Sequence, residues 1–214
     1  MANIKTLKDL TPGTVFDAGP IDVRVLDHMT NGTTLLIADQ AVAWRPFSLE
    51  PMKTRPEEAP TPYPNDFSLS YLKDELNGPF LAAFDAAGGP IRSANIVTAD
   101  WSLVDHRGGF GYGNMKAKIS LLPEALFLKY KALLALDDWW WLVTPHAGSA
   151  YGARCVFAGG SQRVQCLHAV YRHFSAEDVL YVHDVKVLPV EQFLQGVHAK
   201  SVVHNLTADF TVHI

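Results

Sequence analysis

The chain has 214 residues and a formal net charge of −4, and hydrophobic residues make up 48% and charged residues 19%. This composition is typical of a compact globular protein and excludes a predominantly disordered chain. Lys and Arg residues are scattered along the sequence, which excludes the basic stripe of a nucleic-acid-binding protein. No apolar run reaches the roughly 18 to 20 residues of a membrane span. The start, MANIKTLKDLTPG, has no apolar h-region, so we expect a soluble protein without a cleavable export signal.

The first predicted element is a β-hairpin. Val23 and Val25 alternate with polar residues, and the apolar run Leu35 to Ala38 follows Asn31-Gly32, a strong short hairpin signal. Between Pro46 and Pro64 lie six of the thirteen prolines. Because proline fixes φ and lacks an N–H, we predict a surface excursion there instead of a helix or a central strand.

An amphipathic helix is predicted at residues 68–76, with Leu72 and Leu76 on its buried face. Ser68 or Asp66 is available as the N-cap, and Asn77-Gly78 as the stop. A proline at position 79 then begins a second short turn of helix through residue 84.

A second amphipathic helix is predicted at residues 122–134, with Pro123 in its first turn and Tyr130 on its apolar face. The stretch between the helices is ambiguous: residues 91–105 favour a strand, and HRGGFGYGN is a glycine-rich segment. This segment lacks the GxGxxG order of a dinucleotide site and the flanking strand and helix. It therefore predicts a mobile loop and no nucleotide.

Four strand-like segments begin at Trp139, namely WWWLVTP, YGARCVFA, RVQCLHAVYRHF and VLYVHDVKVLP, and they predict a four-stranded meander. If Gly160 and Ser161 are the centre of the second turn, Cys155 lies directly opposite Cys166. The two cysteines are then either reduced thiols, which we favour, or a cross-strand disulfide, which requires an oxidising location.

The C-terminal residues carry two short β-branched runs, at 201–203 and 210–214. They predict strands that add to a sheet edge or exchange with another subunit. We therefore divide the chain into a main domain, residues 1–188, and a C-terminal β extension for oligomerisation or docking, residues 189–214.

Three adjacent tryptophans, Trp139, Trp140 and Trp141, are either a ligand platform or packing. In a strand, neighbouring side chains face opposite sides, so only part of the run can be displayed. The run is apolar on both faces, which favours packing between two cores and a structural role for these residues.

Four motifs follow one another across residues 7–188: VRVLD, SLSYLKDELNGPFLAAF, ISLLPEALFLKY and WWLVTP. In this order they resemble an uncharacterised domain family of Gram-positive bacteria and their phages, which has a W-W-L-R-[ST]-P motif. Val143 replaces the arginine of that motif, and VLYVH replaces a closing G-V-R-P-A. The chain is therefore similar to a divergent member of the C-type-lectin-like and formylglycine-generating-enzyme-like superfamily.

The resemblance implies an α+β, C-type-lectin-like fold with two helices packed on twisted antiparallel β-sheets. In lectin-like proteins of phages and bacteria, the strands and loops after the Trp-Trp-Leu strand present the recognition face. Tyr and Arg supply the contact area and directed hydrogen bonds of interface hot spots. Here that segment carries the candidate ligand-binding residues Tyr151, Arg154, Arg163, Gln165, His168, Tyr171, Arg172 and His173.

Catalytic and metal-binding patterns are weak. No G-x-S-x-G elbow is present, and the adjacent carboxylates Asp137 and Asp138 point to opposite faces of a strand. His168 and His173 lie on opposite faces of a regular strand, and neither HExxH nor a lectin-type calcium triplet occurs. A copper oxidase like the formylglycine-generating enzyme has only the two cysteines as ligands here. We expect no enzymatic activity, cofactor or metal.

We therefore expect a non-enzymatic, lectin-like virion component of a phage or prophage, such as a capsid decoration or receptor-binding protein. It is expected to be made in the host cytoplasm, to form a homo-oligomer, and to bind proteins, cell-surface glycans or other virion proteins, but not nucleic acid. The alternatives are an intracellular bacterial protein-interaction domain and, third, a formylglycine-generating-enzyme-like oxidase.

Overall fold

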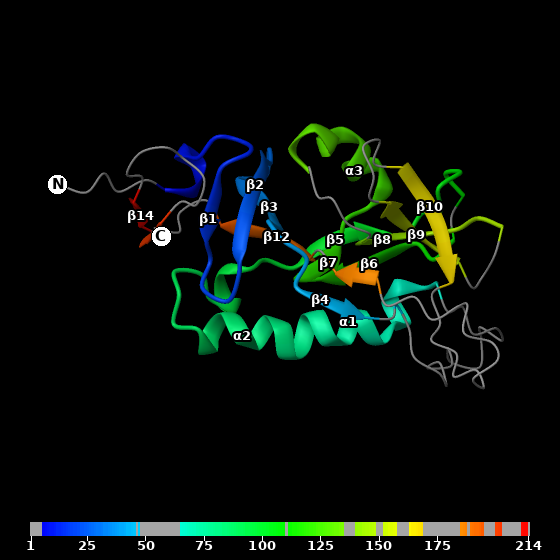
Figure 1. Ribbon diagram of the computed structural model, residues 1–214, viewed down its shortest axis with the longest axis horizontal. Coiled ribbons are helices and arrows are strands. Elements are labelled where there is room, and N and C mark those ends of the chain that lie inside the picture. The colour runs from blue at the N-terminus through cyan, green and yellow to red at the C-terminus, as the bar shows by residue number, and fades with distance from the viewer. Residues whose placement is uncertain are drawn as a thin grey trace.

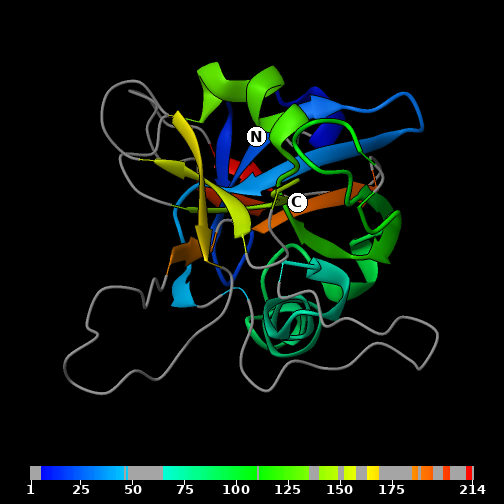
Figure 2. The same ribbon diagram turned by 90° about the vertical axis from the view of Figure 1, so that its right-hand side faces the viewer.

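The computed structural model shows a mixed α+β protein with several small, mostly antiparallel sheets (Figure 1). A helical rod lies on one side of the strands and the shorter helix α3 (Glu124–Tyr130) on the other, as the view along the rod in Figure 2 also shows. The structure describes residues 6–45, 47, 65–109, 111–134, 140–148, 152–157, 163–168, 185–187, 189–194, 200–202 and 211–213.

The first five-stranded sheet contains the predicted hairpin. Its strand order is β1-β2-β3-β12-β7 and all neighbours are antiparallel. The prediction of the hairpin is confirmed, and Gly32, at φ +81°, supplies the left-handed residue of its short loop. The strands are β1 (Val15–Asp17), β2 (Asp22–His28), β3 (Thr33–Ala38), β12 (Pro189–Leu194) and β7 (Ile119–Leu121).

The second five-stranded sheet has the order β10-β9-β8-β11-β4. Its first three strands confirm the antiparallel start of the predicted meander. Within the fourth predicted segment, β11 lies parallel to β8 instead of beside β10, and Pro189 begins β12 of the first sheet, which corrects the meander. The strands are β10 (Arg163–His168), β9 (Gly152–Phe157), β8 (Trp140–Pro145), β11 (Val185–Val187) and β4 (Ala43–Arg45).

The pairing of β9 with β10 differs by one residue from the register that a turn centred on Gly160-Ser161 gives. Cys155 lies opposite Gln165, and Cys166 lies opposite Arg154. The two cysteines are therefore not direct cross-strand partners. The backbone register therefore does not give the directly opposite pairing on which the disulfide alternative was based.

The residues assigned to the C-terminal extension contribute three strands, β12, β13 and β14, among the described residues. β12 occupies positions 189–194 and lies between β3 and β7, inside the first sheet. Beyond it, β13 (Lys200–Val202) and β14 (Thr211–His213) pair with each other in a separate antiparallel sheet.

The helical rod corrects the prediction of two separate helices. α1 (Tyr71–Glu75), the π-helical turn η3 (Leu76–Phe80) and α2 (Leu81–Ala86) follow one another without a break. The predicted stop, Asn77-Gly78, lies inside η3, where the wider turn accommodates a proline that lacks an N–H.

The side-chain amide of Asn77 explains why the rod continues. It donates hydrogen bonds to the carbonyls of Lys73 and Ile119 and accepts from the backbone N–H groups of Lys118 and Ile119. Asn77 therefore fastens the rod to the start of β7 instead of terminating a helix. The α-helical part begins at Ser70, whose hydroxyl accepts from the N–H of Lys73, and not at the predicted caps.

The remaining short elements surround this framework. The second predicted helix is confirmed as α3, with its last turn tightened into η5 (Lys131–Leu133). The ambiguous stretch forms a hairpin, β5 (Ala99–Ser102) with β6 (Asn114–Ala117), and the glycine-rich loop joins its strands. Single 3-10 turns lie at η1 (Leu7–Asp9), η2 (Phe67–Leu69, which Asp66 caps) and η4 (Ser93–Asn95).

The tryptophan strand β8 is buried on both faces. Trp140 and Trp141 have no exposed surface, and they contact different aromatic residues: Trp140 meets Phe127 of α3, and Trp141 meets Phe47, each in an edge-to-face contact with centroids 5.5 Å apart. β8 thus separates two parts of the core, which confirms the packing interpretation for these two residues. Trp139 lies outside the described residues.

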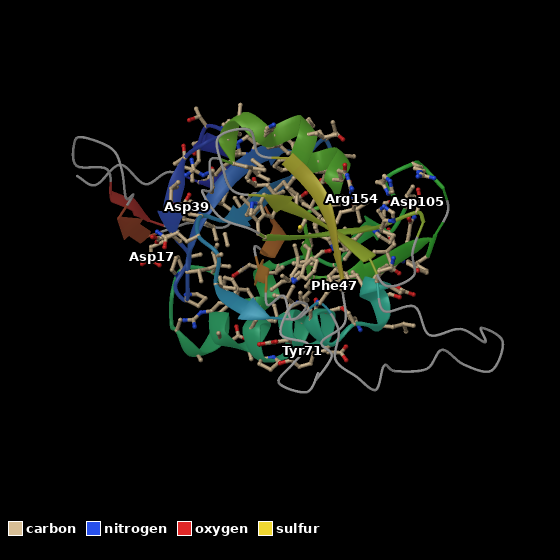
Figure 3. All side chains as sticks on the ribbon, turned by 45° about the vertical axis from the view of Figure 1, so that its right-hand side comes forward. Asp17, Asp39, Phe47, Tyr71, Asp105 and Arg154 are labelled. Carbon is tan, nitrogen blue, oxygen red and sulfur yellow. The ribbon has the colours of Figure 1, made fainter. Side chains whose placement is uncertain are left out.

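Phe47 corrects the prediction that residues 46–64 are only a surface excursion. It is fully buried, and it also contacts Phe67 at 5.6 Å. Figure 3 shows it in the interior of the protein. The other residues of the excursion lie outside the described part of the chain. Leu72, Leu76 and Tyr130 are buried as predicted.

Candidate functional site

Three segments meet at one end of the second sheet, and we call this region the loop junction. It comprises Asn65, the described residues of loop 103–113, and residues 146–148 with Gly152. The buried Asn65 amide donates to the carbonyl of Gly152 at 2.7 Å and accepts a hydrogen bond from the hydroxyl of Tyr112. The backbone N–H of His146 donates to the same carbonyl at 2.9 Å. Backbone and side-chain bonds thus hold loops on a rigid sheet, an arrangement that positions surface residues for binding.

Asp105 shapes the glycine-rich loop. Its carboxylate accepts from the backbone N–H groups of Arg107 at 2.7 Å and Gly109 at 3.0 Å. The bond from Arg107 is the largest cause that lowers the pKa of Asp105, so this side chain is a charged turn former. A Cβ atom at Gly109 would lie 2.5 Å from Asp105 Oδ2, and Gly108 has φ +82°. Gly108 and Gly109 are therefore explained by the geometry of the turn.

His106 and His146 form a stacked pair between the two loops, with ring centroids 4.7 Å apart and ring planes at 28°. The N–H of Ala147 donates to His106 Nδ1 at 3.2 Å, and that of Gly148 to His146 Nδ1 at 3.1 Å. Burial is the largest cause that lowers the pKa of His146, followed by the positive charge of His106 and then that of Arg154. We call these two residues the histidine pair.

Arg154, a predicted ligand-binding residue, joins β9 to α3. Its guanidinium donates to both carboxylate oxygens of Glu124, at 2.8 and 3.1 Å, and the two side chains are only 15% and 17% exposed. Glu124 lies in the first turn of α3, where the helix dipole favours a negative charge. Arg154 lies at the same end of the protein as Asp105 (Figure 3). The position of Arg154 therefore favours a role in holding the loop junction in place.

The other predicted binding residues are only partly placed. On β10, the backbone of His168 lies opposite Gly152 of the loop junction, whereas that of Gln165 lies opposite Cys155 and that of Arg163 opposite Phe157. Of these three positions, only His168 lies at the end of β10 that is next to Gly152. Tyr151, Tyr171, Arg172 and His173 lie outside the described residues.

A second polar cluster, which the sequence did not predict, lies between β2 and α3. Asp27 Oδ2 accepts from Lys129 Nζ at 2.8 Å and from the Tyr130 hydroxyl at 2.6 Å, and Lys129 Nζ also donates to the Tyr130 oxygen at 2.6 Å. We call these three residues the Asp27 clamp. A bulge at Leu26, between Val25 and Asp27, shifts the register of β2 against β3, and such bulges re-aim side chains.

The pKa shifts of the Asp27 clamp favour a structural role. The hydrogen bond from Lys129 is the main cause that lowers the pKa of Asp27. Burial is the main cause that raises the pKa of Tyr130, so its phenol keeps its proton at neutral pH and is a poor base or nucleophile. The same bonds raise the pKa of Lys129, which therefore stays a cation.

No group of three or more His, Cys, Asp or Glu residues within the described ranges is arranged to hold a metal ion. The helices of the same ranges include none that is long and apolar enough to span a membrane. No protein-family model, curated protein or solved structure matches the chain.

Proposed function

We propose that this chain is a non-catalytic binding module with a C-type-lectin-like fold, and that its recognition surface is the loop junction with the adjoining ends of β9 and β10. The observation that carries the proposal is the convergence of two loops and β10 at Gly152. There, bonds from Asn65 and His146 fix the loops, and His168 lies opposite in the neighbouring strand. Binding residues on loops that a rigid sheet positions are a common design of recognition proteins.

The polar groups of the junction divide into holding and contacting residues. Arg154, Asp105 and Asn65 have their hydrogen bonds inside the protein and support the surface. Arg107 is exposed, and its guanidinium donates no hydrogen bond to the described part of the chain. Its guanidinium supplies the donors that suit a protein surface or a glycan, and Tyr151 and His168 stay predicted contact residues.

The biological setting that we propose is a phage or prophage virion, in which the chain serves as an oligomeric decoration or receptor-binding component. This setting rests on the resemblance of the VRVLD, SLSYLKDEL and WWLVTP motifs to a phage-associated domain family. It predicts that the protein sediments with particles or with the host envelope.

Co-sedimentation with purified virions and with envelope preparations of the producing host tests the proposal. We expect the wild-type chain to sediment with one of them, and Arg107→Ala to weaken this binding by about tenfold or more, as hot-spot residues do. The matched control is Lys8→Ala, which removes an exposed cation from η1. Equal binding by wild type and Arg107→Ala would show that the recognition surface lies elsewhere. Absence of binding to both preparations would reject the virion setting.

A further inference from the structure

The hydrogen bonds of the histidine pair fix where its protons lie. A backbone N–H can only donate, so Nδ1 of His106, which faces the N–H of Ala147, must carry a lone pair. The same holds for Nδ1 of His146, which faces the N–H of Gly148. Both rings are therefore neutral, with the proton on Nε2, whenever these two bonds exist.

Protonation of His106 at Nδ1 removes the acceptor of the Ala147 N–H in the other loop, and protonation of His146 at Nδ1 removes the acceptor of the Gly148 N–H in its own turn. A proton on Nδ1 turns His106 into a donor that faces the N–H of Ala147, and the hydrogen bond that joins loop 103–113 to residues 146–148 at this point is lost. Protonation of both rings also places two positive charges in a stack with centroids 4.7 Å apart.

The charges around His146 act against its protonation on balance. Arg107 comes from the same loop as His106, and Arg154 comes from β9, and both lower the pKa of His146. Asp105 is the opposing charge, but its carboxylate already accepts two backbone N–H groups. Glu124 pairs with Arg154 and reduces the effect of that guanidinium.

We propose that His106 and His146 form a pH-sensitive latch, which fastens loop 103–113 to residues 146–148 when both rings are neutral and releases it in mild acid. Release is local, because Tyr112 still bonds to Asn65 and the β5–β6 hairpin holds the ends of the loop. The latch itself is independent of the recognition role. Its consequence, a shift of Arg107 at the binding surface, rests on the proposed function.

Nuclear magnetic resonance on the full-length, ligand-free chain tests the latch separately from binding. Long-range ¹H–¹⁵N spectra at about pH 7.5 should show both rings with the proton on Nε2. Amide exchange at Ala147 and Gly148, corrected for intrinsic rates, should lose protection by about fivefold to tenfold between about pH 7.5 and pH 5, which corresponds to the loss of one hydrogen bond at each. Met29, whose N–H bonds to Thr33 in the β2–β3 hairpin, should keep its protection.

Two variants make the result specific. His106→Phe keeps an aromatic ring for stacking but cannot titrate or accept, so its Ala147 amide should be weakly protected at every pH. Tyr112→Phe removes the neighbouring tether and should leave the pH response of Ala147 and Gly148 intact. A ring with its proton on Nδ1 at neutral pH, a protection at Ala147 that does not change with pH, or an equal loss at Met29 would each overturn the proposal.

Discussion

Two polar clusters hold distant parts of this chain together, and they use different chemistry. In the Asp27 clamp, a carboxylate, an ammonium group and a phenol share bonds of 2.6 to 2.8 Å between β2 and α3. In the histidine pair, two uncharged rings accept backbone N–H groups at 3.1 and 3.2 Å. The clamp depends on opposite charges, whereas the pair depends on the absence of charge.

This difference gives the two clusters different pH ranges. The pKa of Asp27 lies below its ordinary 3.8, so its contribution to stability is present above about pH 4 and is lost as the pH falls through the lower folded value. The pKa of Lys129 lies above 10.5, so its contribution is lost only at higher pH. The pKa of His146 lies below 6.5, so its contribution is present above that pH and is lost on acidification through the folded value. Mild acid should therefore weaken the histidine pair while it leaves the Asp27 clamp intact.

Removal of the clamp carboxylate should have the largest effect. Asp27→Ala removes the acceptor of the Lys129 and Tyr130 bonds, and it leaves a mostly buried phenol without its carboxylate. Because Asp27 is 33% exposed and solvent screens the ion pair, we expect the free energy of unfolding to fall by about 2 kcal/mol. Urea unfolding should give the same decrease at about pH 5.5 and pH 7.5. A decrease that differs between these two pH values would contradict the assigned pH range of the clamp.

Local sequence patterns predicted the elements whose structure depends on neighbouring residues. Asn31-Gly32 predicted the hairpin because the turn itself requires a residue with positive φ. The apolar spacing from residue 122 predicted α3, and the apolar character of Trp140 and Trp141 on both sides of their strand predicted a buried strand. These features need no knowledge of the rest of the chain.

Features that depend on contacts between distant residues were missed or wrong. Asp27 and Lys129 lie 102 positions apart, and nothing near either residue indicates the other. Asn77 was predicted to end a helix because the local sequence does not indicate its hydrogen bonds to β7. The only local indication of the histidine pair is a histidine next to a turn in each loop. A stacked contact between two loops does not follow from the spacing of residues in the sequence, so the pair could not be predicted.

A smaller effect is expected at the other tether of the loop junction. Tyr112→Phe removes the hydroxyl that donates to the buried Asn65, and we expect the free energy of unfolding to fall by about 1 kcal/mol. Neither group titrates between about pH 5 and pH 8, so the decrease should be the same across that range. Chemical unfolding of the variant at both ends of the range measures it. A decrease that grows on acidification would show that this tether and the histidine pair are coupled.

The histidine pair should contribute less to global stability and should do so only above its titration range. His146→Phe keeps a ring for stacking but cannot be protonated. We expect the wild-type chain to lose up to about 1 kcal/mol of its free energy of unfolding between about pH 7.5 and pH 5, and the variant to lose less. The comparison of the two pH profiles is the measurement. Parallel profiles would show that His146 does not carry the acid sensitivity, whatever the other histidines do.

The smallest effect is expected at the exposed member of the clamp. Lys129→Met leaves the Tyr130 to Asp27 bond in place, and the Lys129 side chain is 57% exposed, so water replaces much of its interaction. The variant should lose less stability than Tyr112→Phe, and the loss should shrink further at high salt, because exposed charges are screened. Lys116→Met, which removes an exposed cation from β6, is the matched control. A loss as large as that of Asp27→Ala would mean that the ammonium group, and not the carboxylate, is the centre of the clamp.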